Sequence, residues 1–165
     1  MTLLGMVSGG KITQMLFMTY RSPLLSPLTY VRLLTHVLGH NGWGHYAGNM
    51  SYILLLGPML EEKYGSRTML ELIAVTAVIT GLLNAALFPG TALCGASGVV
   101  FAFILMTSFT GFRQGEIPLT FLLIAVIYLG QQVADGLFLR DNISNLSHIA
   151  GGLVGAAAGY VFNKK

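Results

Sequence analysis

The chain has 165 residues, of which 54% are hydrophobic and only 9% charged, with a formal net charge of +3. Soluble domains carry roughly 25% charged residues, so this chain cannot cover itself with polar surface, and we expect the lipid bilayer to be its solvent. Its Lys and Arg residues form no cluster, which argues against nucleic acid as a partner. The single cysteine, Cys94, excludes an internal disulfide.

Five apolar stretches approach the roughly 20 residues that a membrane-spanning helix needs. The expected helices cover residues 45–60, 68–88, 97–112, 117–138 and 143–162. Short polar or Pro-Gly connections separate them, so neighbours in the sequence should be antiparallel. The sequence therefore predicts an all-α polytopic membrane protein with five full transmembrane helices, in which residues 1–165 form a single domain.

The segment before the first of these helices differs from the rest. Residues 2–8 are apolar but far too short to cross a membrane, and we interpret them as the tail of a helix whose beginning lies outside this sequence. Residues 9–44 combine cationic residues, proline and serine breaks and the only tryptophan, Trp43. Tryptophan is enriched at membrane–water interfaces, so we expect a structured loop that lies at the membrane surface.

Three polar segments, 45–49, 95–98 and 148–151, each lie near the start of an expected helix. Polar residues inside hydrocarbon are costly and usually serve a function. Because the helices alternate in direction, the first, third and fifth run the same way. Each polar segment is followed by helix of roughly 21 Å at 1.5 Å per residue. In a hydrocarbon core about 30 Å thick, all three segments should therefore lie about 10 Å below the same surface.

The helical period then indicates which polar side chains share a helix face. His45 and Asn49 are four residues apart and share a helix face. On the last helix, one stripe contains His148, Gly151, Gly155 and Gly159. Small residues let two backbones approach closely, so we expect this helix to bring His148 within the 2.6–3.2 Å or so of a hydrogen bond to Ser97. Phe101, one turn after Ser97, should pack its ring against the imidazole.

Several residues allow a second interpretation. His36, His40 and His45 could be read as zinc ligands, but no Cys or carboxylate completes the set. We expect no metal, and we expect His36 and His40 to hold hydrogen bonds within the loop instead. Cys94 is interpreted as a small buried residue rather than a redox site. The glycine stripe could also join two lipid-facing helices of a dimer.

Taken together, these motifs resemble the rhomboid family of intramembrane serine proteases over about residues 30–163. The matching elements are His45-x3-Asn49, Gly95-x-Ser97-Gly98, His148-x2-Gly151-x3-Gly155, Arg32-Leu-Leu-Thr-His36-x3-His40 and Glu62-Lys63-x-Gly65-Ser66. The resemblance implies a six-helix bundle whose first helix precedes residue 9 and is mostly absent from this sequence. Bacterial members of a short, loop-poor type fit best.

The resemblance implies a catalytic dyad, with Ser97 as the nucleophile and His148 as its general base. It also implies an oxyanion hole made of His45, Asn49 and the backbone N–H groups of Ser97 and Ala96. The residues that would support the site by packing are Gly95, Gly98, Phe101, Gly151 and Gly155. No cofactor is implied. Phe101 stands where relatives often carry Tyr, and Gly48 stands where a bulkier side chain is common, so the contact to the base and the shape of the substrate pocket should differ.

The function expected on this basis is an intramembrane serine endopeptidase that cleaves transmembrane segments of other membrane proteins. We expect it in the bacterial plasma membrane, with the active site opening to the extracytoplasmic side; the Lys and Arg residues slightly favour a cytoplasmic C-terminus. Two alternatives are an inactive relative that binds membrane clients and a small transporter. The polar groups gather at one depth and no inverted repeat is visible, which counts against a transporter. The sequence leaves the oligomeric state open.

Overall fold

The computed structural model describes residue 5, residues 7–110, residues 119 and 126, and residues 142–163. These parts of the chain are helical apart from their connecting loops and one antiparallel β-bridge, between Thr19 and Leu93. The helices are α2 (Lys11–Leu16), α3 (Pro27–Thr35), the 3₁₀ helix η1 (His36–Leu38), α4 (Trp43–Tyr64), α5 (Ser66–Leu87), α6 (Ser97–Thr110) and α8 (Asn142–Asn163). The predicted all-α class is confirmed for the described parts.

Four of the five predicted long helices are present, as α4, α5, α6 and α8, with ends that differ by a few residues. α4 continues through the polar turn to Tyr64, because glutamate and lysine are good helix formers. It ends at Gly65, whose φ of 83° breaks the helical path. The fourth predicted helix, residues 117–138, lies outside the described residues except at 119 and 126, and most of the tail predicted at 2–8 also lies outside them.

The predicted interfacial loop, residues 9–44, contains three short helices that the sequence did not reveal. α3 begins at Pro27, a residue suited to the first turn of a helix. Inside the molecule, Arg32 Nε donates to the carbonyl of Met15 at 2.8 Å, and the guanidinium carbon lies 4.5 Å from the centre of the Tyr20 ring. Thr35 Oγ1 also donates to the carbonyl of Leu16. These contacts tie α3 to α2 and to the segment that follows α2.

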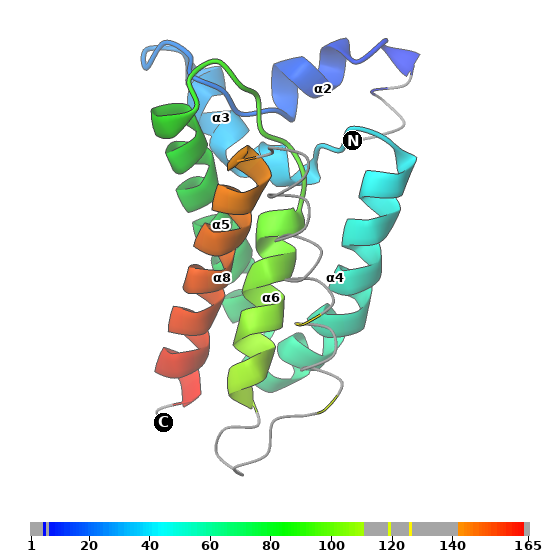
Figure 1. Cartoon of the computed structure of the whole chain (residues 1–165), viewed down its shortest axis with the longest axis vertical. Coiled ribbons are helices and arrows are strands. Elements are labelled where there is room, and N and C mark those ends of the chain that lie inside the picture. Colours follow the sequence, from blue (N-terminus) through cyan, green and yellow to red (C-terminus); the bar gives the residue numbers. More distant parts are fainter. Residues whose placement is uncertain (1–4, 6, 111–118, 120–125, 127–141, 164–165) are drawn as a thin grey trace.

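Figure 1 shows that α4, α6 and α8 run in one direction and α5 runs in the opposite direction. The alternation predicted from the sequence is therefore present in these four helices. The ends at which α4, α6 and α8 begin lie at the same end of the bundle, which we call the site end.

α6 occupies the centre of the bundle (Figure 1) and is apolar on all sides. Its side chains with at most 2% exposure include Val99, Val100, Phe103, Ile104 and Met106. A helix that is hydrophobic all round belongs in a core, and here the core is formed by α4, α5 and α8 packed around α6. Any group at the first turn of α6 is thereby fixed relative to its neighbours.

α6 and α8 meet backbone to backbone along the glycine stripe. A Cβ added at Gly151 would overlap the carbonyl group of Gly98, and one added at Gly155 would overlap that of Ala102. Gly152, one residue off the stripe, differs: its Cβ would lie 3.6 Å from the side chain of Leu105, an ordinary van der Waals distance. The close approach predicted from the glycine spacing is confirmed, and this seam is part of one bundle.

The described helices differ in whether their length and composition suit a membrane crossing. α5 is the one helix in this part of the chain that is long and apolar enough to cross a membrane by length and composition, and Ser97–Ser108 of α6 is apolar but shorter. α4 contains Pro58 and the charged residues that precede Tyr64, which lower its apolar character. The five full crossings expected from the sequence therefore stay a prediction.

The seam gives a stability prediction with a built-in control. Gly151→Ala and Gly155→Val should lower the melting temperature in detergent by several degrees, because overpacking costs about 1–3 kcal/mol and each kcal/mol corresponds to about 2–4 °C in a chain of this size. Gly152→Ala should leave it unchanged or raise it, since alanine favours helix over glycine by about 1 kcal/mol. Equal melting temperatures for Gly151→Ala and Gly152→Ala would contradict the backbone contact.

Candidate active site

The three polar segments singled out in the sequence lie at the site end. His45 is the third residue of α4, Ser97 is the first residue of α6 and His148 is the seventh residue of α8. The first bond inside α6 is accepted by the carbonyl of Ala96 from the N–H of Val100, at 2.9 Å. The N–H of Ser97 therefore lies in a first helical turn, where no preceding helical carbonyl can accept it.

The loop that leads to Ser97 is held by backbone hydrogen bonds from distant segments. Thr19 and Leu93 exchange two bonds of 2.9 and 2.8 Å, and the N–H of Gly95 donates to the carbonyl of His36 at 2.9 Å. Asn84 Nδ2, buried in α5, donates to the carbonyl of Thr91 at 3.0 Å. Sequence reasoning missed Thr19 and Asn84; a buried asparagine in an otherwise apolar helix was the available signal.

Gly95 is the point where this loop meets α4. Its φ of 126° is a conformation that L side chains rarely adopt, and an added Cβ would lie 2.6 Å from His45 Cε1 and 2.7 Å from His45 Nε2. The same Cβ would be 3.7 Å from Asn49 Nδ2. Glycine therefore lets the loop pass directly against the face of α4 that carries both polar side chains.

Asn49 is buried, with 4% of its surface exposed. Its Nδ2 group has no hydrogen-bond partner among the described residues. A buried donor without a partner costs about 1–3 kcal/mol, and such groups call for an explanation. Asn49 thus presents an unused N–H beside Gly95, close to the start of α6.

Ser97 and His148 lie on adjacent turns across the glycine seam. The Cβ position of Gly98 is 3.4 Å from the carbonyl oxygen of Ser147. His148 is buried, and its ring stacks on that of Phe101 with the centroids 4.5 Å apart and the planes at 15°. The predicted stacking of Phe101 on the imidazole is confirmed.

The hydrogen bond from Ser97 to His148 that the sequence analysis expects stays a prediction. What the structure holds fixed is the backbone approach and the stacked ring, while the Ser97 side chain is only half-buried.

The two remaining histidines differ in their contacts. His36 holds the hydrogen bonds that were expected, since its ring Nε2 lies 3.0 Å from the carbonyl oxygen of Ala77 and its own carbonyl binds Gly95. Both ring nitrogens of His40 are buried; neither makes a hydrogen bond of good geometry with the described residues, although the backbone of Leu38 is near enough to act on the ring and raise its pKa. Its ring packs edge-on against His45 at 5.1 Å. Burial, and secondarily the neighbouring His45, lower the pKa of His40 to about 4, so the ring is neutral near pH 7.

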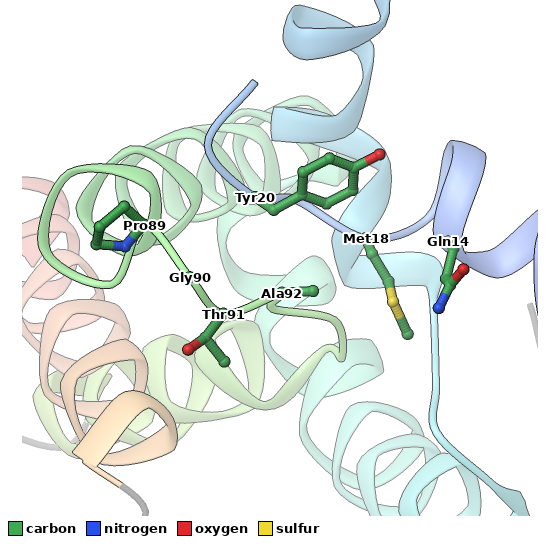
Figure 2. A pocket seen from close by; sticks show the side chains of 7 residues that line it. All are labelled: Gln14, Met18, Tyr20, Pro89, Gly90, Thr91 and Ala92. Carbon is green, nitrogen blue, oxygen red and sulfur yellow. The ribbon is translucent and has the colours of Figure 1, made fainter. Parts of the chain in front are cut away.

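Pockets border the site. One of about 320 Å³ is lined by Gln14, Met18 and Tyr20 from one segment and by Pro89–Ala92 from the loop that leads to Ser97 (Figure 2). Another, of about 440 Å³, is lined by residues of α2 and by His40. Within the described residues, no three His, Cys, Asp or Glu side chains gather closely enough to hold a metal ion.

Comparison with known proteins identifies a family to which the sequence is similar. The rhomboid domain model matches residues 27–165. Rhomboid protease GlpG of Haemophilus influenzae is 28% identical over 136 residues, which cover 81% of this chain and 70% of the relative. Rhomboid-related protein 2 of Mus musculus is 31% identical over 160 residues, covering 83% of this chain and 52% of the relative.

Rhomboid protease GlpG of Yersinia pestis is 30% identical over 128 residues, covering 75% of this chain and 45% of the relative. The chain thus spans about half the length of the mouse and Yersinia relatives. Because the rhomboid domain extends over most of its residues, the chain belongs to the rhomboid family of integral membrane proteins.

Proposed function

We propose that this protein is an intramembrane serine endopeptidase that hydrolyses peptide bonds in or near transmembrane segments of other membrane proteins. The observation that carries the proposal is the seam between α6 and α8. It sets the first turn of α6, with Ser97, beside the turn of α8 that carries His148, and it stacks His148 on Phe101. The names of the relatives from Haemophilus influenzae and Yersinia pestis, both called rhomboid protease, support the same reaction class.

In the proposed reaction, Ser97 Oγ attacks the carbonyl carbon of the scissile peptide while His148 takes the hydroxyl proton. The tetrahedral intermediate collapses, the C–N bond breaks, and His148 gives its proton to the leaving amine. Water then attacks the ester carbonyl carbon and loses a proton to His148. The bond between that carbon and Ser97 Oγ breaks, His148 returns the proton to Oγ, and the products are a carboxylic acid and free Ser97. Serine needs such an adjacent base because its hydroxyl group, with its unperturbed pKa, stays protonated and is a weak nucleophile.

In this scheme, Phe101 orients the imidazole ring of His148. The buried polar side chains of the described residues include no Asp or Glu, so we propose a dyad rather than a triad. A ring stacked at 4.5 Å restricts rotation of the imidazole about its side-chain bonds. Correct orientation of the base is worth orders of magnitude in rate.

The oxyanion of the intermediate would be stabilised by Asn49, by His45 and by the N–H of Ser97, with Ala96 N–H as a further donor. The Nδ2 group of Asn49 supports this role, because it is a buried donor with no hydrogen-bond partner among the described residues. Each such donor is worth about 2.7–4 kcal/mol of transition-state stabilisation in soluble serine proteases.

The membrane arrangement is part of the proposal. α4, α5 and α8 each contain 22 residues, about 33 Å at 1.5 Å per residue, which suffices for a core about 30 Å thick. The five crossings that the sequence predicts, with α6 and residues 117–138 as the other two, are part of this proposal. We place the site end on the extracytoplasmic side of a bacterial plasma membrane, and the C-terminus in the cytoplasm.

The first test of this function targets the proposed dyad. Ser97→Ala and His148→Ala should each abolish cleavage of a model transmembrane substrate in liposomes, because nucleophile and base act as a unit. A fluorophosphonate probe should label the wild type and leave Ser97→Ala unlabelled. Ser51→Ala, which removes an exposed serine from α4, is the control and should behave as wild type. Labelling or turnover by folded Ser97→Ala would rule out the assignment, and a wild type that never labels would favour a client-binding relative.

A second test concerns the oxyanion donors. Asn49→Ala and His45→Ala should reduce kcat/KM by about 10²-fold or less, while Ser97 still reacts with the fluorophosphonate. Asn49→Ala should not lower its melting temperature, because it removes a buried Nδ2 donor that has no partner among the described residues. If either variant unfolds while its remaining folded fraction has full activity, the residue has a structural role instead.

A further inference from the structure

Side chains join α4 and α8 at the end of the bundle opposite the site end. Asn163, the last residue of α8, donates from Nδ2 to the hydroxyl oxygen of Tyr64, the last residue of α4, at 2.7 Å. The same Nδ2 group donates to the carbonyl of Gly159 at 2.8 Å, which orients the amide on its own helix. The Tyr64 ring also packs against Phe162, with the ring centroids 6.1 Å apart. We call Tyr64, Phe162 and Asn163 the far-end clasp.

The two helices that the clasp joins carry different parts of the proposed site. α4 carries the oxyanion donors and α8 carries the base, and they pack on different sides of α6 (Figure 1). α8 meets α6 through the backbone contacts of the glycine seam, which leave no space for a side chain. α4 meets α6 through side chains: a Cβ on Gly57 would lie 3.6 Å from the Phe103 ring, an ordinary van der Waals distance. Because side chains can yield where backbones cannot, the tilt of α4 needs a further support.

The packing of α4 changes along its length. Leu56 and Leu60, in the half nearer the clasp, are 5% and 0% exposed. In the half nearer the site end, a Cβ added at Gly44 or Gly48 would meet no atom of another described segment within 4 Å. The half of α4 that carries the proposed oxyanion donors is therefore the more open one, and the position of this helix is set mainly from the clasp end.

A small tilt of α4 would move its donors by a distance that matters for catalysis. Asn49 lies fifteen residues before Tyr64, which is about 22 Å along a helix at 1.5 Å per residue. Over that length, a tilt of about 3° about the clasp displaces Asn49 by about 1 Å. A misplacement of about 1 Å can cost on the order of 10²-fold in rate. A contact that limits the tilt of α4 therefore contributes to the rate without touching the substrate.

We propose that Tyr64 and Asn163 are positioning residues of the peptidase. Their hydrogen bond fixes the far end of α4 to α8 and thereby aligns the oxyanion donors on α4 with Ser97 and His148. The inference rests on the proposed function, because that function assigns the donors to α4 and the base to α8. The clasp acts through the donors, which stabilise the transition state more than the bound substrate. Its loss should therefore slow the chemical step and leave substrate binding intact.

The kinetic test removes the hydrogen bond of the clasp. Tyr64→Phe, which keeps the ring, and Asn163→Ala should each lower kcat for a transmembrane substrate in liposomes by about 10-fold, a part of what a full 1 Å displacement costs. KM should stay unchanged. Arg67→Gln is the matched control, because it breaks a side-chain hydrogen bond to Glu71 at the same end of the bundle but within one helix, and it should behave as wild type.

A combined variant shows whether the clasp acts through the donors. In an Asn49→Ala background, Tyr64→Phe should lower kcat by a smaller factor than it does alone, because the donor that it misplaces is already absent. A general loss of structure would lower kcat by the same factor in both backgrounds. Equal factors, or an unchanged kcat for Tyr64→Phe alone, would overturn the proposal.

A distance measurement tests the clasp without catalysis. In a Cys94→Ala background, Ser51→Cys on α4 and Leu153→Cys on α8 carry spin labels at exposed positions. Double electron–electron resonance in liposomes should give a broader or longer distance distribution for Tyr64→Phe than for the same chain with Tyr64 intact. Asn163→Ala replaces Tyr64→Phe if the latter does not fold. An unchanged distribution would overturn the proposal in an active enzyme, whereas a changed distribution in a protein without peptidase activity would leave the clasp in place and remove the proposed function.

Discussion

The contact between the backbones of α6 and α8 is the constraint on which the rest of the site depends. Lipid is as apolar as the helices, so helices in a membrane associate through close packing rather than through the hydrophobic effect. Gly98 and Gly151 meet without a side chain between them, and so do Ala102 and Gly155. This approach stacks Phe101 on His148 and sets the turn of Ser97 beside it. A shift of about 1 Å at a catalytic centre can cost on the order of 10²-fold in rate. The direct backbone contact between α6 and α8 resists such a shift and is therefore a suitable support for the proposed dyad.

A second constraint follows from the irregular backbone before Ser97. Loops at membrane depth need every backbone polar group satisfied by protein. The Thr19–Leu93 pair, the Gly95–His36 bond and the Asn84–Thr91 bond satisfy backbone groups of Thr91, Leu93 and Gly95. Each partner comes from a different part of the chain, so residues 9–44 are as much a part of the site as the long helices.

Some of this architecture was predictable and some was not. Long helices and their alternation follow from local composition, and the glycine stripe and Phe101 follow from the helical period, so each depends on residues within one segment. The Thr19–Leu93 bridge joins segments far apart in the chain, and no local pattern reveals it. The helix α3 was read as loop because prolines and cations surround it, yet Arg32 turns inward to a carbonyl and a tyrosine ring. The roles of Ser97, His148, His45 and Asn49 come from the resemblance to the family, because no local pattern specifies a reaction, and they are proposals.

The resting site holds a donor that is not yet used. Asn49 Nδ2 is buried beside Gly95 and has no partner among the residues that the structure describes, which costs about 1–3 kcal/mol in the free protein. In water that cost would vanish through solvation, but the donor would then have to shed water before it could bind an oxyanion. In a low-dielectric site the donor is already desolvated and aimed, so its interaction with developing charge needs no reorganisation. The unpaired donor of Asn49 lowers the stability of the free protein, and in the proposed reaction the same donor stabilises the tetrahedral intermediate. The rigid seam of α6 and α8 lets the fold tolerate this loss.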